Sequence, residues 1–181
     1  MRKVIASEHV TLDGVMDEPG HWSFQFWSKE SSQFKHDELF AADALLLGRV
    51  TYEGFAKAWP TMEGTGDYGE RMNSMPKYVA STTLTNPEWN ATVIRGPVEE
   101  AVAELKQQPG QDVLVFGSTQ LLHTLMQHDL IDEYRLMVNS IVLGTGRLHF
   151  GEGVEKKALR LVGTKTFSSG IVLLTYQPDK Q

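Results

Sequence analysis

The sequence predicts an α/β fold in which helices cover both faces of a mixed, mostly parallel central sheet. Short apolar runs typical of buried strands alternate with helical patterns along most of the chain, and after Glu133 only strand-like segments remain. Alternating strands and helices favour parallel pairing through right-handed crossovers. The turn residues Ser168-Ser169-Gly170 separate two of the late strands and predict a C-terminal antiparallel hairpin.

The composition is that of one globular domain, which we expect to span residues 1–181. Of its residues 41% are hydrophobic, enough for a single buried core. The net charge of −6 and the lack of clustered Lys and Arg disfavour nucleic-acid binding. The sequence contains no cysteine, which excludes disulfides and thiolate catalysis and fits a reducing cytoplasm. Apolar runs are too short for a signal peptide or membrane span, so we expect a cytoplasmic protein without membrane partners.

Each element is predicted from its local pattern. The first strand is expected over 3–10, followed by a long loop to about Trp27. A helix is expected over 29–42, although its apolar residues match the helical period only moderately. The later elements are expected in this order: strand 43–48, helix 51–58, surface loop 63–69, strand 76–81, a helix that begins at Pro97 and ends before Pro109, strand 112–116, a helix capped by Ser118, strand 133–143, and the hairpin strands 158–166 and 171–176.

Three strand ends carry groups that suit a phosphate. Gly117-Ser118-Thr119-Gln120-Leu121 joins a strand to a helix start, where free N–H groups attract anions. Gly48-Arg49-Val50-Thr51 offers a cation and a hydroxyl at a second such junction, and Ser81-Thr82-Thr83 offers hydroxyls at a third. An ordinary capped turn explains each of them taken alone. Together they predict one sheet edge that holds an extended dinucleotide, although the Rossmann and Walker glycine motifs are missing.

Candidates for chemistry and substrate contact lie in the first half of the chain. Asp13 and Glu30 are candidate proton donors, but an ordinary turn explains Asp13 slightly better, and a solvated carboxylate at a helix start is the more common explanation of Glu30. The aromatic cluster in the long loop after the first strand could stack on a flat heterocycle or pack as core. The candidates for substrate contact are Trp22, Phe26, Trp27 and Tyr52. The histidine spacing gives no reason to expect a metal site.

Five short motifs, in this order, are similar to those of the dihydrofolate reductase superfamily, and most closely to its riboflavin-biosynthesis reductase branch. They are Thr11-Leu12-Asp13-Gly14, Leu47-Gly48-Arg49-x-Thr51-Tyr52-Glu53, Lys77-Tyr78-Val79-x-Ser81-x-Thr83-Leu84, Val115-x-Gly117-Ser118-x-x-Leu121 and Val142-Leu143-Gly144-x-Gly146-x-x-x-Phe150. The resemblance covers nearly the whole chain and implies a three-layer dihydrofolate reductase-like fold.

The resemblance also implies NADPH as the cofactor. It places Arg49 and Thr51, beside Gly48, at the phosphates on the adenosine side. Ser81, Thr82 and Thr83 then lie near the adenine ribose, Gly117 to Leu121 around the pyrophosphate, and Ala6 near the nicotinamide. Relatives often pair, so a homodimer is expected.

The sequence departs from the family pattern at three places. Thr82 stands where many relatives carry Arg, which leaves NADH open beside NADPH. Gly117-Ser118 replaces the two glycines that dihydrofolate reductases join by a cis peptide. The folate-binding acid has no secure counterpart, although counting back from Phe34-Lys35 leads to Glu30.

The predicted function is hydride transfer from NADPH to a small heterocycle such as a pterin or a pyrimidine of riboflavin synthesis. The alternative is a non-catalytic, nucleotide-binding homodimer of the same fold. True dihydrofolate reduction is a third hypothesis, which the insecure Glu30 disfavours.

Overall fold

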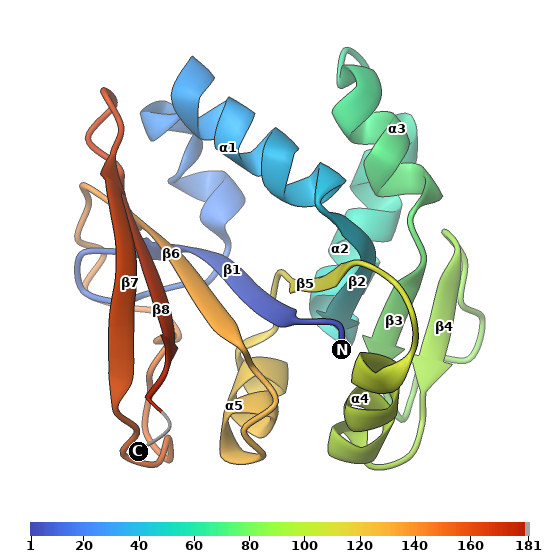
Figure 1. The fold of residues 1–181 in the computed structure, drawn as a ribbon. Helices are drawn as coiled ribbons and strands as arrows, with labels where there is room; N and C mark the ends of the chain where they lie inside the picture. The colour runs from blue at the N-terminus through green and yellow to red at the C-terminus, as the bar shows by residue number, and fades with distance from the viewer. Residues whose placement is uncertain (180–181) are drawn as a thin grey trace.

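The computed structural model describes residues 1–179 and assembles their strands into one eight-stranded sheet (Figure 1). The strand order is β4-β3-β2-β5-β1-β6-β8-β7. The strands are β1 (Val4–Thr11), β2 (Ala42–Gly48), β3 (Lys77–Ala80), β4 (Ala91–Ile94), β5 (Asp112–Val115), β6 (Glu133–Asn139), β7 (Leu159–Thr166) and β8 (Val172–Pro178). Strands β1 to β6 pair in parallel, whereas β8 is antiparallel to both β6 and β7. The predicted mixed sheet with its closing hairpin is confirmed.

Helices cover both faces of the sheet, as predicted (Figure 1). They are α1 (Lys29–Phe40), α2 (Arg49–Ala58), α3 (Gly66–Ser74), α4 (Val98–Gln107) and α5 (Thr119–Gln127). Leu39, Tyr52 and Met72 bring α1, α2 and α3 into one apolar cluster, while Val102 and Leu122 bring α4 and α5 into another. A strand between two such layers is buried on both sides, which explains the continuous apolar run of β2.

Helix α1 has a weak apolar period for a physical reason. Ser28 caps the helix, because its side chain accepts from the Ser31 N–H while the Ser31 hydroxyl accepts from the Ser28 N–H. The buried face of the helix carries Lys35 and Glu38 beside Leu39. Charged side chains therefore occupy positions that a surface helix normally fills with apolar residues.

Three expectations about the elements were wrong. The loop expected over 63–69 contains the start of α3 at Gly66, which the glycines at 64, 66 and 69 had concealed. The edge strand β4 was not predicted, because it contains no buried residue and so lacks the apolar run that marks a central strand. The strand expected over 133–143 ends at Asn139, and the chain beyond it is held at the β1 side by a backbone hydrogen bond from Leu12 to Ile141 of 2.8 Å.

Strand β1 has different partners along its length. It pairs with β6 over Ile5–Thr11 but with β5 over Val4–Ala6. Beyond Ala6, β1 and β5 diverge, while β5 leads into the turn at Gly117. The sheet is therefore forked between β1 and the start of α5, and the candidate site lies around this fork.

We expect Leu46→Ala to reduce the free energy of unfolding by about 2–5 kcal/mol, because it opens a cavity in the middle of the sheet. Leu46 is fully buried in the apolar cluster under α4 and α5. Denaturant unfolding followed by circular dichroism measures the change. Leu12→Ala is the control, since Leu12 is 63% exposed and its loss should cost less than about 0.5 kcal/mol. Equal losses in the two variants would contradict this placement of the core.

Candidate functional site

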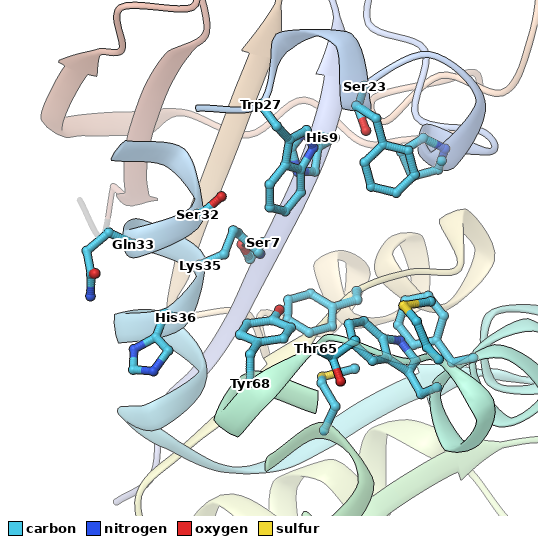
Figure 2. Close-up of a pocket in the computed structure, with 18 of the residues that line it drawn as sticks. Ser7, His9, Ser23, Trp27, Ser32, Gln33, Lys35, His36, Thr65 and Tyr68 are labelled. Atoms are coloured by element: carbon cyan, nitrogen blue, oxygen red, sulfur yellow. Dashed lines mark hydrogen bonds between the residues drawn. The ribbon is translucent and has the colours of Figure 1, made fainter. Parts of the chain in front are cut away.

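A cavity of about 920 Å³ opens between β1, α1 and the segment from α2 to α3. Its wall is mostly aromatic and includes Phe24, Trp27, Phe55, Trp59, Tyr68 and Phe116. Figure 2 shows Trp27 and His9 on one side of the space and Thr65 and Tyr68 on the opposite side. A volume of this size, with apolar walls and few polar groups, is typical of a small-molecule site.

A network of buried charges forms the base of the α1 wall. Lys35 Nζ donates to Glu38 Oε2 at 2.5 Å and to the Ser7 hydroxyl at 2.9 Å. The Ser7 hydroxyl in turn donates to Glu38 Oε2 at 2.8 Å. Arg135 of β6 reaches Glu38 Oε1 at 3.1 Å and Glu133 at 2.7 Å. Burial alone would raise the pKa of Glu38, but Lys35 and Arg135 hold it below its usual value.

Glu8 and His9 are the two titratable residues of β1 that border the cavity, and their side chains lie on opposite faces of the strand. Glu8 is 6% exposed, and its Oε1 has no hydrogen-bond partner among residues 1–179. Burial raises the pKa of this carboxyl well above its usual value, and the effects of Lys35 and Glu38 are smaller and opposite in sign. The carboxyl is therefore protonated well above the pH at which an exposed glutamate ionises.

The His9 ring stacks on Trp27 with the ring centroids 5.5 Å apart. Its Nδ1 lies 3.3 Å from the Asn139 amide nitrogen, and its Nε2 is buried without a partner in the described part of the chain. Burial lowers the pKa of His9 to about 3, so the imidazole is neutral at physiological pH. A neutral ring that accepts at Nδ1 carries its hydrogen at Nε2, where it can donate to a ligand.

The three predicted anion sites meet in a second cavity, of about 420 Å³. Its lining residues from the prediction are Gly48, Arg49, Ser81, Thr82, Thr83, Ser118, Gln120 and Leu121. Arg147, from the loop after β6, also lines this groove and was not predicted. The strand ends of β2, β3 and β5 therefore converge, which is the arrangement that a single extended dinucleotide requires.

Close backbone contacts shape the floor of this groove. The Gly48 N–H donates to the Gly117 carbonyl at 3.0 Å, and the Gly117-Ser118 peptide is cis. A Cβ added to Gly48 would lie 2.3 Å from the Ser118 hydroxyl oxygen, so a larger residue cannot fit. Ser118 is the N-cap residue of α5, as predicted, but its hydroxyl makes no capping bond to the described helix. This hydroxyl and the first N–H groups of α5 remain available to an anion.

Other predicted cofactor residues lie close to the groove. Ala6 is fully buried where β1 last pairs with β5. Thr51 lies beside the turn, since its hydroxyl would be 3.1 Å from a Cβ on Gly117. Thr119 is the first residue of α5. The contacts of Ala6, Thr51 and Thr119 with a cofactor stay predictions.

The two predicted acids lie outside the residues that line the large cavity. Asp13 accepts from the Gly144 N–H at 2.7 Å, the Leu143 N–H at 3.2 Å and the Thr11 hydroxyl at 2.6 Å. The bond from Thr11 contributes most to the lowered pKa of Asp13. This carboxylate therefore ties the loop after β1 to the loop after β6, which favours its interpretation as a turn residue. Glu30 is exposed and accepts from the Ser168 N–H at 3.1 Å.

The four aromatic residues predicted to contact the substrate lie in different parts of the structure. Trp27 lines the large cavity. Trp22 is buried, with its indole N–H donating to the Asp17 carbonyl at 2.8 Å, and Phe26 packs against the core cluster of Met137 and Phe167. The Tyr52 hydroxyl is held by the backbone of Glu88. The packing interpretation therefore fits Trp22, Phe26 and Tyr52, while Trp27 is placed to stack on a ligand.

The sequence contains a pattern that marks the buried polar residues near the cavity, which were not predicted. Ser7-Glu8-His9 interrupts an apolar strand with three polar residues, and all three line the cavity. Lys35 and Glu38 interrupt the apolar face of α1 in the same way. Charged residues are rarely buried without a partner or a function, so such interruptions mark candidate site residues.

Comparison with known proteins places this chain in a family. The model of the RibD C-terminal domain matches residues 2–173. This chain belongs to the RibD C-terminal domain family. Two proteins of Bacillus subtilis (strain 168) are similar over almost their whole length. Uncharacterized protein YyaP is 31% identical, with 97% of this chain and 94% of that protein covered. Uncharacterized protein YwjB is 29% identical, with 95% and 96% covered.

Solved structures confirm the dihydrofolate reductase-like fold. A putative riboflavin biosynthesis protein from Shewanella sp. PV-4 superposes with a TM-score of 0.78 at 20% identity, covering 99% of this chain and 100% of that one. Dihydrofolate reductase from Enterococcus faecalis, complexed with NADP(H), superposes with a TM-score of 0.67 at 17% identity, covering 98% and 97%. Among residues 1–179, no helix combines the length and apolar composition needed to cross a membrane.

We expect acidification to destabilise the protein partly through His9. The folded chain keeps this ring neutral down to pH about 3, whereas the unfolded chain protonates it near its ordinary pKa of about 6.5. The unfolded state then binds more protons, and stability is lost as the pH falls through this window, by about 3 kcal/mol from His9 at pH 4. His9→Phe should show a shallower loss between pH 7 and pH 4 in urea titrations. The exposed control His128→Asn should behave like wild type, and an unchanged slope in His9→Phe would contradict the prediction.

Proposed function

We propose that this protein is a NADPH-dependent reductase that transfers hydride to a small, flat heterocycle of the pterin or pyrimidine type. One observation supports this most strongly: the groove formed by three strand ends and the aromatic cavity both lie at the fork where β1 leaves β5. The printed name of one structural relative supports the same reaction class. The Thermotoga maritima protein named a deaminase and 5-amino-6-(5-phosphoribosylamino)uracil reductase superposes with a TM-score of 0.68 at 16% identity, with 98% of this chain and 57% of that one covered.

The residues of the groove fit a dinucleotide. The Ser118 hydroxyl and the N–H groups at the start of α5 would hold the pyrophosphate, and Gly48 lets Ser118 pack closely against the end of β2. Arg49 and Arg147 would supply positive charge, which suits the additional phosphate of NADPH although Thr82 itself is uncharged. This second arginine supports NADPH over NADH.

The large cavity fits the substrate. The bound cofactor would supply the hydride, and the protein would position the acceptor beside it. Trp27 would stack on a flat ring, since its own orientation is fixed by His9. The His9 Nε2 hydrogen would orient a carbonyl or ring nitrogen, and the aromatic wall would exclude water from the reacting atoms.

A non-catalytic nucleotide-binding relative is the second candidate, because Asp13 and Glu30 are both engaged away from the cavity. Cofactor would then bind without turnover. The test is an assay of NADPH oxidation with a panel of pterins, pyrimidines and small carbonyl compounds. Even slow oxidation would exclude the non-catalytic alternative.

We expect NADPH to quench the tryptophan fluorescence of the protein, because Trp27 and Trp59 both line the cavity. Titration with NADPH and with NADH gives both affinities, and the tighter binding should be to NADPH. Failure of both cofactors to bind at millimolar concentration would reject the proposed function.

We expect Arg49→Ala to weaken NADPH binding by roughly ten-fold, since a hydrogen bond to a charged group contributes about 1.5–3 kcal/mol. Arg49 now pairs with Glu53 at 2.8 Å on the surface of α2, an exposed pair that contributes little to stability. Calorimetric titration measures the affinity. Arg160→Ala on β7, outside the lining of the groove, is the matched control and should bind like wild type.

A further inference from the structure

We propose that Lys35 of α1 and Tyr68 of α3 form a two-donor site at the base of the large cavity, and that this site selects a substrate ring that presents an oxygen atom to both. The two residues then determine specificity. The inference rests on the proposed reductase function and deepens it, because it names the class of heterocycle that the site takes, an oxo-substituted ring rather than an amino-substituted one. It starts from the position of one buried ammonium group.

The Lys35 ammonium group lies where the two arms of the fork separate. Ala6 and Val115 form the last pair between β1 and β5, and the next residues along the two arms are Ser7 and Phe116. Lys35 Nζ lies 2.9 Å from the Ser7 hydroxyl oxygen and 4.4 Å from the centroid of the Phe116 ring. Ser7, Lys35 and Phe116 all line the large cavity, so the ammonium group lies at its base.

The alternation of side chains along β1 agrees with this position. Ile5 packs into the apolar cluster under α1, α2 and α3. Ser7 is two residues further along the strand and therefore points to the same face, which is the face that the cavity occupies. The bond from Lys35 to Ser7 thus lies on the cavity side of the sheet.

The Lys35 ammonium group has one N–H bond left for a ligand. Of its three donors, one binds the Ser7 hydroxyl and one binds Glu38 Oε2, as far as residues 1–179 are concerned. The Ser7 hydroxyl cannot serve a ligand acceptor instead, because it donates its own hydrogen to Glu38. The Lys35 side chain is 8% exposed and borders the cavity, so its third donor is the cation that the base of the cavity offers.

Tyr68 supplies a second donor from the opposite wall. Figure 2 shows its ring above α3 with the hydroxyl directed toward the side of the cavity where Lys35 and Ser7 lie. Burial raises the pKa of Tyr68, and the charge of Glu38 adds to this effect, whereas no hydrogen bond within residues 1–179 contributes. The hydroxyl therefore keeps its hydrogen and can donate it to a ligand.

The cavity wall offers no matching carboxylate to an amino-substituted ring. Glu8 is the one acid that lines the cavity among the described residues, and its side chain lies on the other face of β1. Glu38 is already bound by Lys35 and Arg135. Amino groups would place further N–H donors against Lys35 and Tyr68 and leave all of them without an acceptor. A carbonyl oxygen accepts from both donors, so the site favours an oxo group.

Two pteridines with the same ring system test this selection. Lumazine carries oxo groups at positions 2 and 4, and 2,4-diaminopteridine carries amino groups there. We expect wild type, in solutions that contain NADP+, to bind lumazine about 100-fold more tightly, which corresponds to about ten-fold for each donor. Calorimetric titration at pH 7 measures both affinities. Binding of 2,4-diaminopteridine as tight as that of lumazine, or failure of both to bind at millimolar concentration, would overturn the proposal.

Tyr68→Phe removes one donor and keeps the aromatic ring. It should weaken lumazine binding about ten-fold and leave the affinity for 2,4-diaminopteridine no lower than in wild type. Tyr176→Phe on β8, outside the lining of the cavity, is the matched control and should bind both pteridines like wild type. Equal losses for the two pteridines in Tyr68→Phe would indicate a packing role alone and would contradict the assignment.

The contribution of Lys35 is tested with its ion pair removed as a unit. Lys35→Met alone would leave the Glu38 carboxylate buried without its nearest cation, which destabilises the fold. In the double variant Lys35→Met with Glu38→Gln, the preference for lumazine should fall from about 100-fold to about ten-fold. An unchanged preference would show that Lys35 does not contact the ligand. If the double variant does not fold, the wild-type comparison and Tyr68→Phe still decide.

Failure of this proposal can be told apart from failure of the proposed function. If neither NADPH nor NADH binds but lumazine is preferred as expected, the reductase function fails and the two-donor site stands as a ligand site. If NADPH binds and the preference for lumazine is absent, the reductase function stands and the two-donor site fails.

Discussion

The divergence of β1 from β5 after Ala6 is the constraint on which the rest of this site depends. A parallel sheet closes its own hydrogen bonds wherever neighbouring strands stay side by side, and it offers no room for a ligand there. Because β5 turns into α5 at Gly117 while β1 continues to Thr11, the sheet opens at one point near its centre. The groove and the aromatic cavity both lie beside this opening.

The arrangement also separates two kinds of recognition. The groove uses backbone N–H groups, hydroxyls and the two guanidinium groups of Arg49 and Arg147, which suit phosphate oxygens. The cavity uses aromatic faces with a few polar groups, which suit a flat ring. A cofactor that is charged at one end and aromatic at the other matches this division.

Much of the fold could be predicted from local patterns, and the cofactor groove could be predicted because it depends on topology. Strand ends of a parallel sheet meet at one edge, so the order of elements along the chain is enough to bring Gly48, Ser81 and Gly117 together. The polar groups at the wall of the large cavity could not be found in this way. Asp13 and Glu30 were chosen for their place beside loops and helix starts, whereas Ser7 and Lys35 come together only because α1 packs over β1. Helix α3 was missed because glycines dominate its first turn, and strand β4 because this edge strand contains no buried residue.

The ion pairs beneath α1 have a consequence for how the cavity behaves when it is empty. The hydrophobic effect is non-directional, but the bonds from Lys35 and Arg135 to Glu38 each require one geometry. Any rotation of α1 about its axis would leave a charge buried and unpaired, which is costly. The helix is therefore locked in a single orientation before a ligand arrives, and the shape of the cavity is set in advance. A rigid wall of this kind spends little conformational entropy on binding and selects its ligand by fit.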